Sequence, residues 1–166
     1  MSVIKIEDIA HVRFAAPDLA KMRAFLTDFG LQSDLSNDQI VYARGLDGAP
    51  YNHVTEQGEP AFKALGLRAE SVNDLVSLAA FDGVSVEDND MPGGGKIVRL
   101  TDPDGFLVEV VAGQQRFATH EFPPETIRNN ADNRTRQSKA VRLEPGPAHA
   151  IRLGHCVLNV SDFKRS

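Results

Sequence analysis

The chain has 166 residues, of which 42% are hydrophobic and 25% charged, which is the balance of a globular protein with a sizeable core and excludes a disordered chain. A net charge of -5, from 18 basic and 23 acidic residues, leaves no broad positive field to hold a nucleic-acid backbone. No run approaches the roughly 18 apolar residues that span a bilayer, and the start of the chain lacks the pattern of a secretory signal, so we expect a cytoplasmic protein without membrane or nucleic-acid partners.

The first predicted elements are a strand and a helix in IAHVRFAAPDLAKMRAFLTDFG, residues 9–30. Hydrophobic and polar residues alternate at its start, as in a strand with one buried face. Asp18 then has the side chain of a helix N-cap, and Gly30 is a plausible stop. Two antiparallel strands are expected next, in IVYARGL and PYNHVTEQG, joined by a turn at Asp47-Gly48. Apolar residues at helical spacing lie between the cap and the stop: Leu19, Met22, Phe25, Leu26 and Phe29.

A second strand and helix are predicted in KALGLRAESVNDLVSLAAFDG, residues 63–83. Ser71, followed three residues later by Asp74, resembles a capping box, and Asp82-Gly83 ends the helix. Two strands, KIVRLT and FLVEVV, follow around the turn Pro103-Asp104-Gly105. The predicted buried face of this helix consists of Leu75, Leu78 and Ala79.

Residues 114–150 lack clear periodicity and are rich in proline, which is typical of a crossing between domains. Their basic residues are interleaved with amides rather than aromatics, so we interpret them as docking the linker on acidic surfaces. The alternation then returns in IRLGHCVLNVSDFKRS, residues 151–166, and meets a capping residue, Ser161 or Asp162. The basic linker residues are Arg128, Arg134, Arg136, Lys139 and Arg142.

The three strand-helix segments share one spacing. His11 precedes Asp18 by seven residues, Ala64 precedes Ser71 by seven, and His155 precedes Asp162 by seven. This spacing indicates an internal repeat. A unit of about 50 residues buries little surface by itself, so two units are expected to pair. The predicted domain is 1–113, with modules at about 8–58 and 59–113.

Residues 8–113, and again the chain from 151, resemble the vicinal oxygen chelate superfamily of glyoxalases, bleomycin resistance proteins and dioxygenases. The motifs that carry the resemblance are IAHVRFAAPDLAKM, TDPDGFLVEVV and, most specific of all, GPAHAIRLGHCVLNVSDFKRS. The last is similar to the linker and second-domain opening of type I extradiol, catechol 2,3-dioxygenase-like enzymes. The resemblance implies an α+β fold in which paired βαβββ modules form a cupped mixed sheet.

The resemblance also implies a function for the full-length protein. Residues 151–166 would begin a second, metal-binding domain that is truncated here, with His155 as the first ligand of a catalytic Fe(II) or Mn(II). A two-His, one-carboxylate site of this kind binds a catechol through both oxygens and leaves a position for O2. One histidine does not hold iron tightly, so we expect the fragment to be inactive, without a bound cofactor and without catalytic residues of its own. From spacing alone, the favoured interpretation of His155 is an inward polar residue of a sheet, and it is the resemblance that favours a metal ligand.

The first domain offers a weaker candidate metal site at His11 and Glu109, which match metal-bearing positions of the superfamily. A third such position is Ala64, which has no donor atom, and His53 is an addition whose strand face the sequence does not fix. Two alternatives therefore stay open. One is a non-catalytic small-molecule-binding module. The other is a glyoxalase-like isomerase whose metal site is shared by two chains of a homo-oligomer, most simply a dimer.

Overall fold

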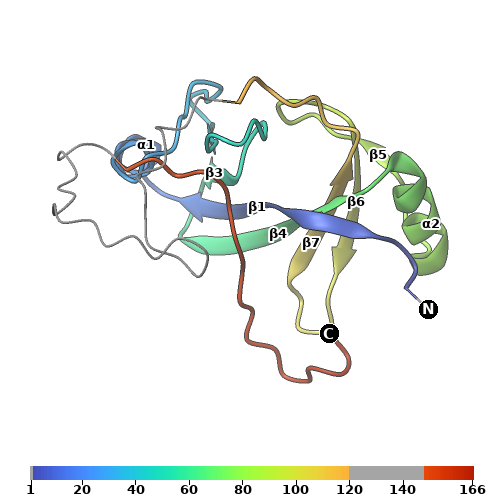
Figure 1. Cartoon of the computed structure of the whole chain (residues 1–166). Coiled ribbons are helices and arrows are strands. Elements are labelled where there is room, and N and C mark those ends of the chain that lie inside the picture. The colour runs from blue at the N-terminus through green and yellow to red at the C-terminus, as the bar shows by residue number, and fades with distance from the viewer. Residues whose placement is uncertain (1, 120–147) are drawn as a thin grey trace, which may run out of the picture.

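The strands of both repeats join into one curled, mixed sheet (Figure 1). The computed structural model describes residues 2–119 and 148–166. The strand order across the sheet is β2-β3-β1-β4-β7-β6-β5. In chain order the elements are β1 (Ile6–Ala16), α1 (Leu19–Asp28), β2 (Ile40–Ala43), β3 (His53–Gln57), β4 (Ala61–Ala69), α2 (Val72–Asp82), β5 (Glu87–Asp88), β6 (Lys96–Thr101) and β7 (Leu107–Ala112).

The two repeats meet at the antiparallel pair β1 and β4, and they are related by an approximate twofold exchange. His11 pairs with Gly66, and Arg13 pairs with Ala64. Exchanging the strands therefore puts Ala64 in the place of His11 and Gly66 in the place of Arg13. Each central strand is also flanked by a parallel strand, β3 beside β1 and β7 beside β4. The equivalence of His11 and Ala64 that the seven-residue spacing predicts is confirmed.

Both helices begin at the predicted caps. Asp18 accepts a hydrogen bond from the backbone N–H of Lys21, at 2.9 Å. Ser71 accepts one from the N–H of Asp74 at 3.2 Å, and its hydroxyl donates to the Asp74 carboxylate at 2.5 Å. Gly83 ends α2 in the left-handed conformation, with φ of 69°, which glycine adopts without steric cost. These contacts satisfy backbone groups that the helix ends would otherwise leave unpaired.

The alternation of β6 and β7 separates the core into two faces. Val98 and Val110 pack with Leu75 and Leu78 of α2, as predicted for that helix. Ile97 and Val111 pack on the other face, in a cluster that includes Tyr51 and Met91. Because successive side chains of a strand point to opposite faces, Arg99 and Glu109 share the face of Ile97 and Val111. The functional candidates of this sheet therefore lie opposite α2.

The apolar residues of α1 are only partly covered. Leu19 and Leu26 are buried against Val41 and Ala43 of β2. Phe25 and Phe29 are each 58% exposed, although they share the helical spacing of the buried residues. The first helix thus leaves aromatic surface on the outside of the sheet, because α1 lies at one end of the sheet while α2 lies at the other (Figure 1).

Two sequence predictions about strands are wrong. The connection from β2 to β3 spans residues 44–52 rather than a tight turn at Asp47-Gly48. Residues 151–160 form no strand, although their alternation remains visible in half-buried Leu153, Cys156, Leu158 and Val160. A strand needs a hydrogen-bonded neighbour. In the described residues this segment's backbone is held only at its two ends: Leu46 N–H donates to the Ile151 carbonyl at 2.9 Å, and Ser161 N–H donates to Asp104 at 2.8 Å.

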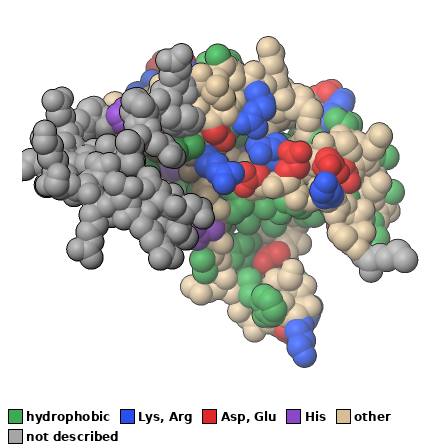
Figure 2. All heavy atoms as spheres, viewed as in Figure 1, with side chains coloured by type: hydrophobic (Ala, Val, Ile, Leu, Met, Phe, Trp, Pro, Cys, Tyr) green, Lys and Arg blue, Asp and Glu red, His purple; other side chains and the backbone are tan. Residues whose placement is uncertain are grey.

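The surface seen in Figure 2 carries acidic and basic side chains next to one another across its middle, with hydrophobic side chains below. Ion pairs of this kind include Lys5 with Glu70 at 2.7 Å and Arg152 with Asp8 at 2.8 Å. None of the helices in the described ranges has the length and apolar content needed to cross a membrane. The five basic linker residues named above lie outside the described residues.

Candidate functional site

His11 and Glu109 meet inside the sheet although 98 positions separate them in the sequence. His11 Nε2 and Glu109 Oε2 lie 2.7 Å apart, and the two residues are 0% and 1% exposed. Their strands are not neighbours, because β4 runs between β1 and β7. Gly66 is the residue of β4 that pairs with both. A Cβ at Gly66 would lie 2.1 Å from His11 Nδ1, so the imidazole reaches Glu109 only by crossing a glycine.

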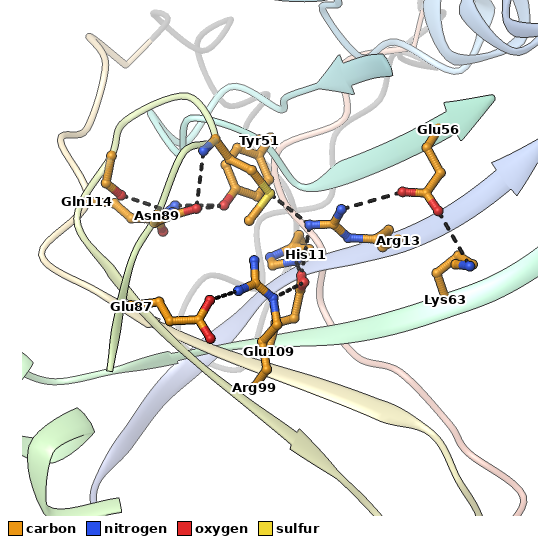
Figure 3. A network of polar contacts seen from close by, with 12 residues as sticks. His11, Arg13, Tyr51, Glu56, Lys63, Glu87, Asn89, Arg99, Glu109 and Gln114 are labelled. Carbon is orange, nitrogen blue, oxygen red and sulfur yellow. Dashed lines mark hydrogen bonds and ion pairs between the residues drawn. The ribbon is translucent and has the colours of Figure 1, made fainter. Parts of the chain in front are cut away.

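Two arginines approach the same carboxylate from different strands (Figure 3). Arg13 Nη2 donates to Glu109 Oε2 at 3.1 Å, and Arg99 Nε donates to Glu109 Oε1 at 3.4 Å. Arg13 also contacts Glu56 at 3.6 Å, and Arg99 pairs with Glu87. The whole network contains three basic side chains and three carboxylates, and it therefore balances its own charge: Arg13, Lys63 and Arg99 against Glu56, Glu87 and Glu109.

The Glu109 carboxyl is ionised at neutral pH. Burial raises its pKa, but the hydrogen bond with His11 and the charge of Arg13 outweigh burial and hold the pKa below its usual range. An ionised carboxylate only accepts hydrogen bonds, so the hydrogen between the two residues belongs to His11 Nε2. His11 Nδ1 is buried against Gly66 and makes no hydrogen bond with any described residue. The imidazole is thus fixed in orientation by one donor contact and one glycine.

Tyr51 also contacts the His11–Glu109 pair, through the His11 ring. Its ring meets the His11 ring edge-on, with centroids 5.0 Å apart and planes inclined by 67°. Its hydroxyl accepts hydrogen bonds from Gln114 at 3.0 Å and from Asn89 at 3.4 Å. Burial raises the pKa of Tyr51 to about 12.

We expect the tyrosines of the folded chain to resist ionisation. The chain has two, and burial also raises the pKa of Tyr42. Absorbance at 295 nm should therefore show little tyrosinate at pH 10, where about half of a free tyrosine is ionised. Tyr51→Phe should remove the later of the two ionisations, with circular dichroism as the check that the chain is still folded. Half of the total absorbance change by pH 10 in a folded sample would contradict this assignment.

The site does not offer a metal the usual set of ligands. The approximate twofold axis that relates the two repeats maps His11 onto Ala64 and Glu109 onto Val54. Neither Ala64 nor Val54 has a side-chain donor atom for a metal. Among the residues that the structure describes, no three His, Cys, Asp or Glu side chains gather closely enough to hold an ion. The two donors that are present bind each other. The candidate pair His11 and Glu109 is therefore brought together, but as an ion-pair network rather than an open ligand set.

His155 lies elsewhere. It is exposed, in the extended segment that forms no strand, whereas His11 and Glu109 are buried. The helix expected to follow it starts as a single turn, in which the Asp162 carbonyl accepts from the N–H of Arg165 at 3.0 Å and of Ser166 at 3.1 Å. The Asp162 side chain accepts from the N–H of Lys164 at 2.9 Å, as a capping residue does. His155 as a metal ligand remains a prediction.

His53 belongs to the opposite face from His11. Its Nε2 lies 2.6 Å from Thr55 Oγ1, and its ring stacks on Phe14 with centroids 5.3 Å apart. It lines an apolar cleft of about 230 Å³ between α1 and residues 150–153, together with Phe25 and Phe29. His53 is therefore no addition to the His11 pair. Burial lowers the pKa of His53 to about 4.

This depressed pKa predicts a loss of stability in mild acid. The ordinary pKa of histidine is 6.5. Between pH 6.5 and about 4, His53 is protonated in the unfolded chain but not in the folded chain, so the free energy of unfolding falls as pH falls. His53→Gln should reduce the difference between urea midpoints at pH 7 and pH 5. Exposed His155→Gln is the matched control and should keep the full difference. Glu109 adds its own loss only below pH 4.5, since its folded pKa lies under that value.

Sequence reasoning missed Arg13, Gly66, Tyr51 and Arg99. Arg13 could have been found, because it lies two residues after His11 on one strand and so shares its face. Gly66 and Arg99 depend on how β4, β6 and β7 align, which no local pattern specifies.

Comparisons with known proteins give structural but not sequence relatives. No family model matches the chain, and no curated protein matches it significantly. The solved Mn(II)-bound glyoxalase from Novosphingobium aromaticivorans superposes with a TM-score of 0.65 and 22% identity, over 72% of this chain and 43% of that one. A variant of homoprotocatechuate 2,3-dioxygenase from Brevibacterium fuscum superposes with a TM-score of 0.62 and 25% identity, over 70% and 35%. The complex of that enzyme with 3,4-dihydroxyphenylacetate gives 0.59 and 25%, over 71% and 39%.

These matches confirm the fold and the resemblance predicted from the sequence. The chain has the vicinal oxygen chelate fold, shared with a glyoxalase and with extradiol dioxygenases. It spans less than half the length of each of these structures. Because one fold holds both kinds of enzyme, the likeness alone does not select a reaction.

Proposed function

We propose that this chain, which has the vicinal oxygen chelate fold, is the N-terminal part of an Fe(II)-dependent extradiol dioxygenase that cleaves a catechol-type ring with O2. The observation that carries the proposal is the match to homoprotocatechuate 2,3-dioxygenase at 25–26% identity over about 70% of this chain but only 35% of the enzyme. The motif GPAHAIRLGHCVLNVSDFKRS, outside the paired modules, supports the dioxygenase over the glyoxalase branch.

In this proposal residues 1–113 are a non-catalytic first domain, 114–150 a linker, and 151–166 the opening of the domain that holds the metal. His155 would be a ligand, and exposure leaves its imidazole free to coordinate an ion with partners supplied by further sequence. Fe(II) bound there would supply chelation of the two catechol oxygens and a position for O2 beside the ring. The first domain would contribute a rigid sheet and not chemistry, because its own candidate donors are already paired.

A glyoxalase-like isomerase with a site shared by two chains is less well supported. Such a site needs a complete ligand set across the interface. Each chain would contribute His11 and Glu109, which bind one another, while the equivalent positions are Ala64 and Val54. Two copies would therefore still lack free donors at the positions that the fold provides.

The test is oxygen uptake by the protein translated from the whole reading frame, loaded with Fe(II), with catechol and 3,4-dihydroxyphenylacetate as substrates. We expect the unchanged protein to take up oxygen. His155→Ala should abolish both oxygen uptake and iron binding, whereas His11→Ala should keep an oxygen uptake that depends on iron. The 166-residue chain alone should show none. A stop codon directly after Ser166, or full activity in His155→Ala, would overturn the proposal.

A further inference from the structure

The network around Glu109 points to a role for Arg13 that goes beyond the proposed function. We propose that the Arg13 guanidinium is a fixed internal cation that closes the His11–Glu109 pair to divalent ions. The proposal concerns the first domain alone and does not depend on the dioxygenase activity.

The position of Arg13 carries the first step of the argument. Its Nη2 lies 3.1 Å from Glu109 Oε2, the same oxygen that lies 2.7 Å from His11 Nε2. An ion bound by these two donors would sit about 2 Å from each of them. It would then share one carboxylate oxygen with a guanidinium at contact distance. A dication and a guanidinium do not share that space, because the two charges repel strongly at such separations and the carboxylate has a single negative charge.

Burial makes the guanidinium hard to displace. The Arg13 side chain is only 15% exposed. Its Nη1 lies 3.6 Å from the Glu56 carboxylate, and its Nη2, which contacts Glu109, also lies 2.9 Å from Met91 Sδ. Arginine stays protonated at all ordinary pH values. Proton loss therefore does not open the pair, in contrast to a site guarded by lysine or histidine.

The twofold relation between the modules shows which residue of the second repeat corresponds to Arg13. Arg13 occupies the position equivalent to Gly66, the glycine that lets His11 cross the sheet. A histidine at Ala64 would need the same free space at residue 13 to reach across in the opposite direction. Arg13 fills that space and carries the positive charge that balances Glu109. The lack of a donor atom at Ala64 and the guanidinium of Arg13 therefore both disfavour a metal ion at this site.

The experiment measures Mn(II) binding by isothermal titration calorimetry on the 166-residue chain and four variants. We expect no saturable binding to the unchanged chain or to Ala64→His. We expect Ala64→His combined with Arg13→Gly to bind one Mn(II) at least about tenfold more tightly than Ala64→His alone, and His11→Ala to remove that binding. Ala64→His with Arg68→Gly is the matched control, because Arg68 lies on the same sheet but pairs with Glu7; it should behave like Ala64→His.

Binding of one Mn(II) by the unchanged chain, lost in His11→Ala, would overturn the proposal. Equal Mn(II) affinities of Ala64→His and of Ala64→His with Arg13→Gly would also overturn the proposal. If the double variant does not fold, Ala64→His with Arg13→Gln replaces it, and the readout is the thermal midpoint with and without 1 mM Mn(II), roughly a hundredfold excess over a Kd of about 10 μM. A rise in midpoint for Ala64→His with Arg13→Gln, absent in Ala64→His alone, supports the closed site, and no rise in either overturns it.

Discussion

Glu109→Gln is expected to lower the free energy of unfolding by about 3 kcal/mol, because it removes the negative partner from a buried ionic cluster. Glu109 is 1% exposed and holds His11 Nε2 at 2.7 Å and Arg13 Nη2 at 3.1 Å. Glutamine keeps the shape of the side chain but leaves the guanidinium without its nearest counterion. Chemical denaturation in urea at pH 7 measures the loss.

The matched control for this change is Glu70→Gln. Glu70 pairs with Lys5 at 2.7 Å, but both side chains are at least about half exposed, and a pair of this kind contributes at most about 1 kcal/mol. Arg13→Met should partly restore the stability of Glu109→Gln, since the two changes together remove both charges and leave neither unpaired. A loss below about 1 kcal/mol in Glu109→Gln would show that the cluster contributes no more than a surface pair.

The helix ends could be predicted from the sequence because they depend on a few neighbouring residues. Asp18 and Ser71 accept hydrogen bonds from backbone groups three residues away, and Gly83 adopts a conformation that its own lack of a side chain allows. The equivalence of His11 and Ala64 was predictable for the same reason, since each is counted from its helix cap. These features need no knowledge of how distant strands align.

The features that the sequence did not predict all depend on a neighbour supplied by another part of the chain. Residues 151–160 have the alternation of a strand, but no described strand pairs with them. Phe25 has the helical spacing of Leu26, yet it is exposed because α1 covers only the end of the sheet. Arg99 meets Glu109 through the register of β6 and β7. Hydrophobic periodicity predicts which residues share one face of a helix or strand, but it does not predict which element covers that face.

Gly66→Ala is expected to be at least as damaging as Glu109→Gln, although it adds only one methyl group. The new Cβ would lie 2.1 Å from His11 Nδ1 and 2.2 Å from Cε1, distances that no real contact allows. His11 is fully buried and cannot swing into solvent. Either the imidazole breaks its contact with Glu109 or β1 and β4 separate, and overpacking of a buried site costs about 1–3 kcal/mol before the broken ion pair is added.

Two glycines provide controls for the Gly66→Ala experiment within the same chain. A Cβ at Gly58 would meet its nearest atom, Ala15 Cβ, at 3.4 Å, and a Cβ at Gly154 would meet nothing within 4 Å. Neither has a positive φ, so alanine at both positions should change the urea midpoint little. If Gly66→Ala unfolds at the same urea concentration as Gly58→Ala, the expectation is wrong, and His11 has space to move away from a Cβ at residue 66. Where Gly66→Ala does lose stability, a second change, His11→Ala, should recover most of that loss, because it removes the ring that the new methyl group strikes.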